Sequence, residues 1–182
     1  MIEVRIHGRG GQGVVTTGQL LAIAAFYDGK ETQTFPVFGV ERSGAPVAAF
    51  VRISDEKINI RSQVYHPDVV LVLDPSLLET VNVADGLKKA GTIIVNTKKS
   101  AKDLGLKGDF DLHIVDATAI AMEIFQRPIV NTLMLGAFAS VTKIISLSGL
   151  DKAIDETILK RKGAQLAEQN KKAIRELCEK CR

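Results

Sequence analysis

Residues 6–22 read IHGRGGQGVVTTGQLLA, and four of the six residues from Gly8 to Gly13 are glycine. Before them, Ile2–His7 alternates apolar and polar residues, which predicts a strand. After them, Val14–Tyr27 carries apolar residues at helical spacing, and Asp28-Gly29 is a typical helix end. The glycines therefore stand where a strand is expected to turn directly into a helix.

The glycines form the pattern G-x-G-x-x-G, with an additional Gly11 inside it. Residues without a Cβ permit tight turns and leave room for a phosphate group. The N–H groups and the dipole of the helix that follows favour the same anion. The candidate phosphate-binding residues are Gly8, Arg9, Gly10, Gly11, Gln12 and Gly13. The alternative is a close crossing of strand and helix that binds no ligand.

A dinucleotide site would also need an acidic residue at the end of the second strand, where it binds a ribose. Asp28 has a suitable spacing from the glycines but stands at the end of the helix. The second strand pattern ends in Phe38-Gly39, and Glu41 follows inside a loop. This mismatch argues against a nicotinamide cofactor.

Strand and helix patterns alternate along the rest of the chain. Strands are expected at Thr32–Phe38, Val47–Ile53, Ile58–Arg61, Val69–Leu73, Ile93–Val95 and His113–Val115, and helices at Pro75–Val83, Thr118–Phe125, Val130–Ser146, Asp151–Lys160 and Gly163–Cys181. A turn at Ser54–Glu56 predicts that Ile58–Arg61 forms an antiparallel hairpin, which makes the sheet mixed. We therefore expect one α/β domain over residues 1–182, a three-layer α/β/α fold with a Rossmann-like mixed sheet.

Polar residues follow three of the predicted strands, at Asp74, Asn96-Thr97 and Asp116. In an open α/β sheet, ligands bind beyond the carboxyl ends of parallel strands, so these residues would share an edge with the glycines. Each of them also suits the N-cap of the helix that follows, and for each one singly this structural interpretation is favoured.

The loop Gly39–Pro46, GVERSGAP, places the charged pair Glu41-Arg42 and Ser43 between two glycines. An arginine there suits a phosphate or a partner's carboxylate, and Glu41 would orient it. Composition alone slightly favours a surface turn with an incidental ion pair.

Several classes of protein are disfavoured by composition. The formal net charge of +3 gives no reason to expect a nucleic-acid partner. The apolar run Ile129–Leu147 is interrupted by polar residues and is expected to be a buried helix rather than a membrane span. The N-terminus lacks the pattern of a signal peptide, so a cytoplasmic protein is expected.

Metal and redox sites are also disfavoured. His7, His66 and His113 are scattered along the chain without ligand spacing. Cys178 and Cys181 fall on a terminal Lys/Glu-rich helix, where they are expected to be incidental. Two cysteines are too few for a protein-held iron–sulfur cluster of the usual kind.

Three segments resemble the gamma subunit of 2-oxoacid:ferredoxin oxidoreductases, and the resemblance extends over essentially the whole chain. They are HGRGGQGVVTTGQLLA (His7–Ala22), FPVFGVERSGAPVAAFVRIS (Phe35–Ser54) and NTLMLGAF (Asn131–Phe138). The form FGVERSGAPV is closer to the pyruvate-type branch than to the 2-oxoglutarate-type branch.

The resemblance implies a heterotetrameric enzyme with alpha, beta and ferredoxin-like delta subunits. Such an enzyme decarboxylates pyruvate oxidatively on thiamine diphosphate, passes electrons through iron–sulfur clusters to ferredoxin, and forms acetyl-CoA. Thiamine diphosphate and the clusters are expected on the partner subunits, and the gamma chain on the CoA side. CoA is then the expected ligand of the glycine turn, and Glu41, Arg42 and Ser43 are expected to approach the active centre or a neighbouring subunit. The isolated chain should be inactive.

Three other functions remain open from the sequence. The chain suits a related complex that acts on 2-oxoisovalerate or an aryl pyruvate. It also suits a stand-alone Rossmann-type NAD-binding dehydrogenase, or an assembly module whose glycines serve packing alone.

Overall fold

The computed structural model describes residues 1–36 and 44–181. Its elements are, in chain order, β1 (Ile2–Arg9), α1 (Val14–Tyr27), β2 (Glu31–Pro36), β3 (Pro46–Ser54), β4 (Val69–Val72), the 3₁₀ helix η1 (Pro75–Glu79), β5 (Gly91–Asn96), the 3₁₀ helix η2 (Ala101–Leu104), β6 (Phe110–Val115), α2 (Ala117–Phe125), α3 (Met134–Thr142), α4 (Leu147–Ile154), the π-helical turn η3 (Asp155–Leu159), α5 (Lys160–Lys162) and α6 (Ala164–Lys180).

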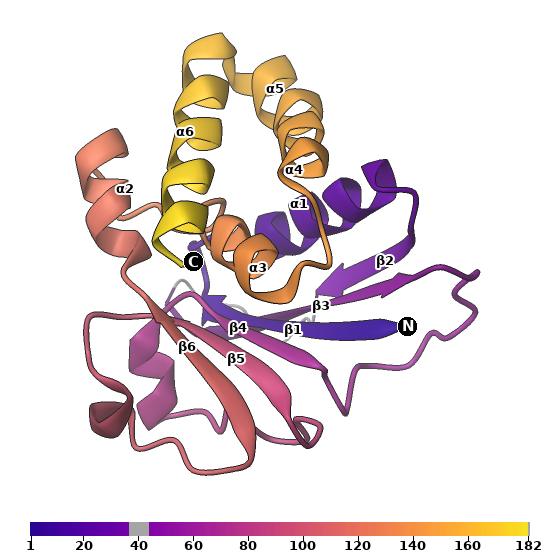
Figure 1. The fold of residues 1–182 in the computed structure, drawn as a ribbon, viewed down its shortest axis with the longest axis vertical. Helices are drawn as coiled ribbons and strands as arrows, with labels where there is room; N and C mark the ends of the chain where they lie inside the picture. The colour runs from indigo at the N-terminus through magenta and orange to yellow at the C-terminus, as the bar shows by residue number, and fades with distance from the viewer. Residues whose placement is uncertain (37–43, 182) are drawn as a thin grey trace.

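The six strands form one sheet in the order β2-β3-β1-β4-β5-β6 (Figure 1). Strands β1, β4, β5 and β6 are parallel, whereas β3 runs antiparallel to both β1 and β2. The mixed sheet is therefore confirmed, but the predicted hairpin is wrong, because Ile58–Arg61 forms no strand. Both edges of β3 are already paired, with β1 and with β2, so no edge is free for a further strand.

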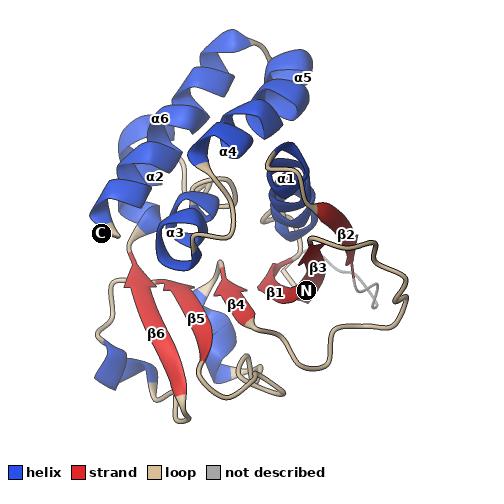
Figure 2. Cartoon of the chain, turned by 45° about the vertical axis from the view of Figure 1, so that its right-hand side comes forward, coloured by secondary structure: helices blue, strands red, loops and turns tan. Residues whose placement is uncertain are grey.

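The two faces of the sheet are covered differently. Helices α1 to α6 all lie on one face (Figures 1 and 2), where they enclose the main apolar core. The second core lies on the other face of β4, β5 and β6, under η1, η2 and their loops. Strand β4 is buried on both faces, as its continuous apolar run predicts. The α/β class is confirmed, and its thin third layer is built from 3₁₀ turns and loops, with η1 in place of the predicted helix Pro75–Val83.

The C-terminal helices begin at places set by their caps. Helix α4 starts before the predicted Asp151, because the Ser146 Oγ accepts a hydrogen bond from the Gly149 N–H at 2.9 Å. After α4 the chain passes through η3 and α5 before α6. The long predicted helix Val130–Ser146 is shorter in the structure, where α3 spans Met134–Thr142.

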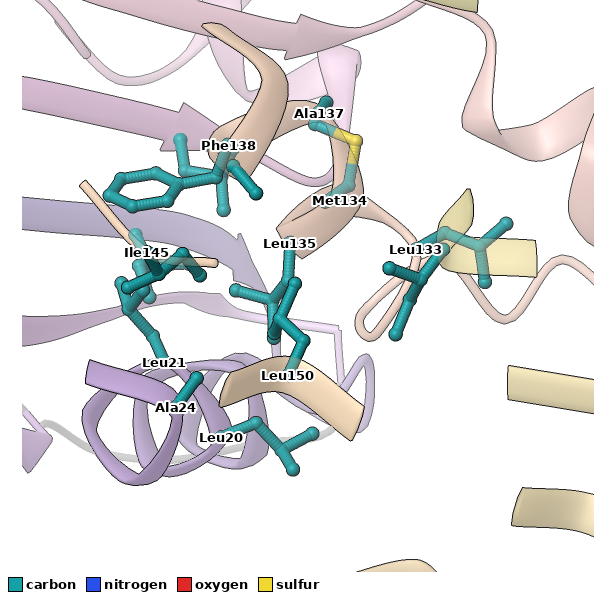
Figure 3. Packing of buried hydrophobic residues seen from close by; sticks show 14 of the residues in the cluster. Leu20, Leu21, Ala24, Leu133, Met134, Leu135, Ala137, Phe138, Ile145 and Leu150 are labelled. Atoms are coloured by element: carbon teal, nitrogen blue, oxygen red, sulfur yellow. The ribbon is translucent and has the colours of Figure 1, made fainter. Parts of the chain in front are cut away.

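The main core is centred on α1, α3 and α4 (Figure 3). Figure 3 shows the side chains that meet there, among them Leu20, Leu21, Ala24, Leu133, Leu135, Phe138, Ile145 and Leu150. Residues Met134–Ser140 of α3 are all buried, which confirms a core helix in the apolar run. In the described part of the chain, no helix is both long enough and apolar enough to span a bilayer.

On the other face, one buried arginine joins three strands. The Arg52 side chain on β3 is 1% exposed, and its Nε donates to the Glu3 Oε1 on β1 at 2.9 Å. Its two Nη atoms donate to the Gln33 Oε1 on β2 at 3.1 Å and to the Gln63 carbonyl at 3.2 Å. This guanidinium therefore holds β1, β2, β3 and the loop after β3 together.

Candidate functional site

The glycine turn connects the end of β1 to the start of α1, as the sequence predicts. Gly11 and Gly13 have φ values of 92° and 80°, in the left-handed region that favours glycine. A Cβ on Gly11 would have no heavy atom of the described residues within 4 Å, so none of these residues fills the space beside it. A Cβ on Gly13 would lie 2.5 Å from the Asn131 Nδ2, so this position is closed by packing.

Gly8 has a different part in the turn. A Cβ on Gly8 would lie 2.5 Å from the Cγ2 of Val14, the first residue of α1. The absence of a side chain at Gly8 therefore lets α1 begin directly against β1. Gly8 thus serves the close crossing of strand and helix, while Gly11 borders open space.

Side chains brace the turn from within. The Gln12 Oε1 accepts a hydrogen bond from the Arg9 backbone N–H at 2.7 Å, and the Gln12 Nε2 donates to the Asp74 Oδ2 at 2.7 Å. The Arg9 guanidinium donates to the Ser76 Oγ from Nη2 at 2.7 Å and to the Gly44 carbonyl from Nη1 at 3.0 Å. These hydrogen bonds hold the turn in a defined shape.

The Asp74 carboxylate is the acceptor at the centre of this network. Its Oδ1 accepts from the Ser76 N–H at 3.0 Å, which also caps η1. Burial is the largest single influence and would raise the pKa of Asp74, but hydrogen bonds from Ser76 and Gln12 and the charge of Arg9 together lower it below its ordinary value. Asp74 is therefore ionised near neutral pH, and Arg9, 3.4 Å from it, balances its charge.

The start of α1 presents backbone N–H groups at the glycine turn. Its N-cap is Gly13, and within the described residues no side chain caps its first turn, which also contains no acidic residue. Helices α2 and α4, by contrast, are capped by the side chains of Asp116 and Ser146. The first N–H groups of α1 and its dipole therefore favour an anion beside Gly11.

The loop with Glu41, Arg42 and Ser43 lies outside the described residues, but its C-terminal end is described. The Gly10 N–H donates to the Ala45 carbonyl at 2.8 Å, and the Gly44 N–H donates to the Gly10 carbonyl at 3.1 Å. The two segments that the sequence singles out are therefore joined by backbone hydrogen bonds at Gly10.

Of the polar residues at the strand ends, Asp74 alone among those described takes part in the glycine-turn network. Asp116 caps α2 by accepting from the Ala119 N–H at 2.9 Å, as the structural alternative predicts. Asn96 is buried, and its Nδ2 donates to the Leu73 carbonyl and to the Thr118 Oγ1, each at 3.0 Å. Asn96 therefore joins β4 and β5 to α2.

Two residues near the turn received no role from their sequence positions. The Ser76 Oγ accepts a hydrogen bond from the Arg9 guanidinium, and the Asn131 side chain fills the space that a Cβ on Gly13 would need. The Asn131 carbonyl also accepts from the Thr17 Oγ1 at 3.2 Å. The sequence contains one indication that Asn131 is important, because it is the first residue of one of the three segments that resemble the oxidoreductase family.

The histidines and cysteines do not gather. His7 is buried, and burial, followed by the charge of Arg5, lowers its pKa to about 4, so it is neutral at neutral pH. Cys178 and Cys181 are free thiols on and just after α6, and burial, then Cys178, raises the pKa of Cys181. Within residues 1–36 and 44–181, no three His, Cys, Asp or Glu side chains are grouped for a metal ion.

Comparison with known proteins identifies the family of this fold and site. The family model described as pyruvate ferredoxin/flavodoxin oxidoreductase matches residues 3–179. The pyruvate synthase subunit PorC of Methanocaldococcus jannaschii is 53% identical over 180 residues, which cover 99% of each chain. The common gamma subunit of the pyruvate/ketoisovalerate oxidoreductases of Thermococcus litoralis is 52% identical over 183 residues, covering 99% of this chain and 97% of that one.

A solved structure agrees with both. The crystal structure of the pyruvate oxidoreductase subunit PORC of Thermotoga maritima superposes with a TM-score of 0.84 at 40% identity, covering 98% of this chain and 95% of that one. The chain therefore belongs to the pyruvate ferredoxin/flavodoxin oxidoreductase family, as a gamma-type subunit of a multi-subunit pyruvate oxidoreductase.

Proposed function

We propose that this chain supplies part of the CoA site of a pyruvate:ferredoxin oxidoreductase. The complete enzyme converts pyruvate and CoA to acetyl-CoA and carbon dioxide and passes the electrons to ferredoxin. The observation that carries the proposal is the braced turn at Gly11–Gly13: among the described residues, none fills the space beside Gly11 and no side chain caps the start of α1. In this proposal the chain binds and orients the CoA phosphates, while the chemistry takes place on sister subunits.

The residues present suit a phosphate in three respects. None of the described residues fills the space beside Gly11, none of their side chains caps the first N–H groups of α1, and Arg9 brings N–H donors to the edge of the turn. Arg9 uses three of its five N–H donors on described residues, which leaves two for an anion. Backbone hydrogen bonds join Gly10 to Gly44 and Ala45, which follow Glu41, Arg42 and Ser43 in the chain, and we propose that these three residues complete the site.

Sister subunits must then supply the redox groups. With two cysteines, this chain has fewer thiolates than the four that an iron–sulfur cluster requires. We therefore assign thiamine diphosphate and the clusters to the alpha, beta and ferredoxin-like delta subunits, in a cytoplasmic complex that delivers electrons to ferredoxin.

A second substrate is favoured by one specific comparison. The relative from Thermococcus litoralis is named as a subunit common to pyruvate and ketoisovalerate oxidoreductases. A gamma chain that binds CoA has no need to recognise the 2-oxoacid, because CoA is common to both reactions. This chain is therefore also a candidate for a second complex, in which other subunits select 2-oxoisovalerate.

Asp28, one of the two acids considered as a ribose ligand for the dehydrogenase alternative, has another structural role. The Asp28 carboxylate accepts hydrogen bonds from the Ser146 N–H and Oγ, each at 2.6 Å. Asp28 therefore holds α1 to the start of α4.

The test replaces Gly11 by leucine in the assembled enzyme and measures CoA binding by calorimetry. The side chain would enter the open space beside the turn, and we expect the Kd for CoA to rise at least tenfold, or about 1.4 kcal/mol. Gly29→Leu is a matched control, because Gly29 has a φ of 80° and equally open surroundings at the other end of α1. Equal CoA affinity in both variants and in the wild-type enzyme would refute the proposal.

A further inference from the structure

A groove of about 680 Å³ lies along α1. Its walls are α1, β2, the segment before α3, and the hairpin formed by η3, α5 and α6. Figure 2 shows α5 at the end of this hairpin that is farthest from the sheet. The α1 wall runs from Thr16 to Phe26, which at 1.5 Å per residue is about 15 Å.

Large apolar side chains lie exposed at this groove. Phe26 on α1 is 64% exposed, and Ile129, before α3, is 45% exposed; both line it. Apolar groups that are exposed around one groove are typical of a surface that binds another protein or a ligand, because their hydration is unfavourable.

The hairpin adds positive charge to the groove. Helix α5 consists of Lys160–Lys162, and its Arg161 and Lys162 line the groove. Neither side chain forms an ion pair with a carboxylate of the described residues. Glu156, the acid that lines the groove there, accepts a hydrogen bond from the Tyr27 hydroxyl at 2.7 Å. Because a neutral hydroxyl leaves the Glu156 carboxylate charged, the groove lining carries two positive charges and one negative, and the resulting net positive charge complements an occupant with carboxylates.

We propose that this groove is the docking surface for a helix of another subunit of the same oxidoreductase complex. The helix would present an apolar face to Phe26 and Ile129, with Asp or Glu residues beside Arg161 and Lys162. The groove takes about ten residues of a helix, which is enough for the i, i+3, i+4 and i+7 anchors of a helix-in-groove contact. A small ligand is a poorer match, because such sites bury most of the ligand, whereas Phe26 stands largely outside.

The first test replaces Phe26 by glutamate and compares Tyr65→Glu. Tyr65 is a matched control, since it is 65% exposed and lies outside the groove lining. The melting temperature of the isolated chain should change by no more than a few degrees in either variant. With the other subunits added, Phe26→Glu should weaken assembly at least tenfold in analytical ultracentrifugation, and Tyr65→Glu less than twofold. Assembly of Phe26→Glu at wild-type affinity would overturn the proposal.

The second test addresses the charge and identifies the occupant. Arg161→Glu with Lys162→Glu should weaken assembly, and the exposed pair Lys102→Glu with Lys107→Glu should not. A photo-crosslinking amino acid in place of Phe26 in the assembled complex should label a helix of a sister subunit that has an apolar face and neighbouring Asp or Glu residues. Labelling of a second copy of this chain, labelling of no subunit, or a small molecule retained there in native mass spectrometry would each contradict the proposal.

Discussion

The glycines of the turn satisfy three different physical requirements. Gly8 allows close packing, Gly11 needs a left-handed backbone in open surroundings, and Gly13 needs that backbone within a closed space. For an ordinary residue the left-handed conformation costs about 1–2 kcal/mol. A residue in a closed space meets a steric penalty in addition.

We predict that Gly13→Ala destabilises the protein more than Gly11→Ala does. At Gly11 the loss should be the backbone cost of about 1–2 kcal/mol alone, whereas the Cβ introduced by Gly13→Ala would also collide with the Asn131 Nδ2. Asn131→Ala should recover part of the loss at Gly13 and none at Gly11. Urea denaturation of the single and double variants measures this coupling. Additive effects of the Gly13 and Asn131 changes would show that the contact is not restrictive.

At the scale of elements, small residues determine how closely the helices approach. A Cβ on Gly136 of α3 would lie 2.3 Å from the Ile174 carbonyl oxygen on α6. A Cβ on Gly18 of α1 would meet only the Thr34 Oγ1 at 3.0 Å, with Val51 and Ala49 at ordinary distances. A backbone carbonyl in a packed helix cannot move aside, but a hydroxyl can rotate.

We therefore predict opposite outcomes for two substitutions that are identical in helix propensity. Alanine is favoured over glycine in a helix by about 1 kcal/mol. Gly18→Ala should be neutral or stabilising for this reason. Gly136→Ala should lose about 1–3 kcal/mol, because α3 and α6 must separate. Thermal unfolding followed by circular dichroism distinguishes the two, and equal melting temperatures would refute this account of the α3–α6 contact.

At the scale of the whole molecule, the chain is one part of an enzyme. Its described residues hold no grouped metal ligands, and in the function proposed above its glycine turn binds and orients CoA without reacting with it. We predict that the purified chain alone does not oxidise pyruvate and that activity appears on adding the sister subunits. Reduction of a viologen dye with pyruvate and CoA measures this. Turnover by the isolated chain would contradict the division of labour proposed above.

Local patterns were enough to predict much of this protein. The strand–glycine–helix order at Ile2–Tyr27, the buried strand at Val69–Val72 and the core helix in the run 129–147 all follow from neighbours in sequence. The family also follows from the sequence, because its characteristic segments are contiguous. These features depend on backbone conformation and hydrophobic periodicity, which a short stretch of chain specifies by itself.

Only the tertiary structure decided which distant segments meet. The pairing of β3 with both β1 and β2 removed the predicted hairpin, and it enclosed Arg52, a charged residue that alternation alone would leave in solvent. The closure of Gly13 by Asn131 and the joining of Gly10 to Gly44 likewise connect residues far apart in the chain. Such contacts depend on how strands and helices are ordered in space, and local propensity does not specify that order.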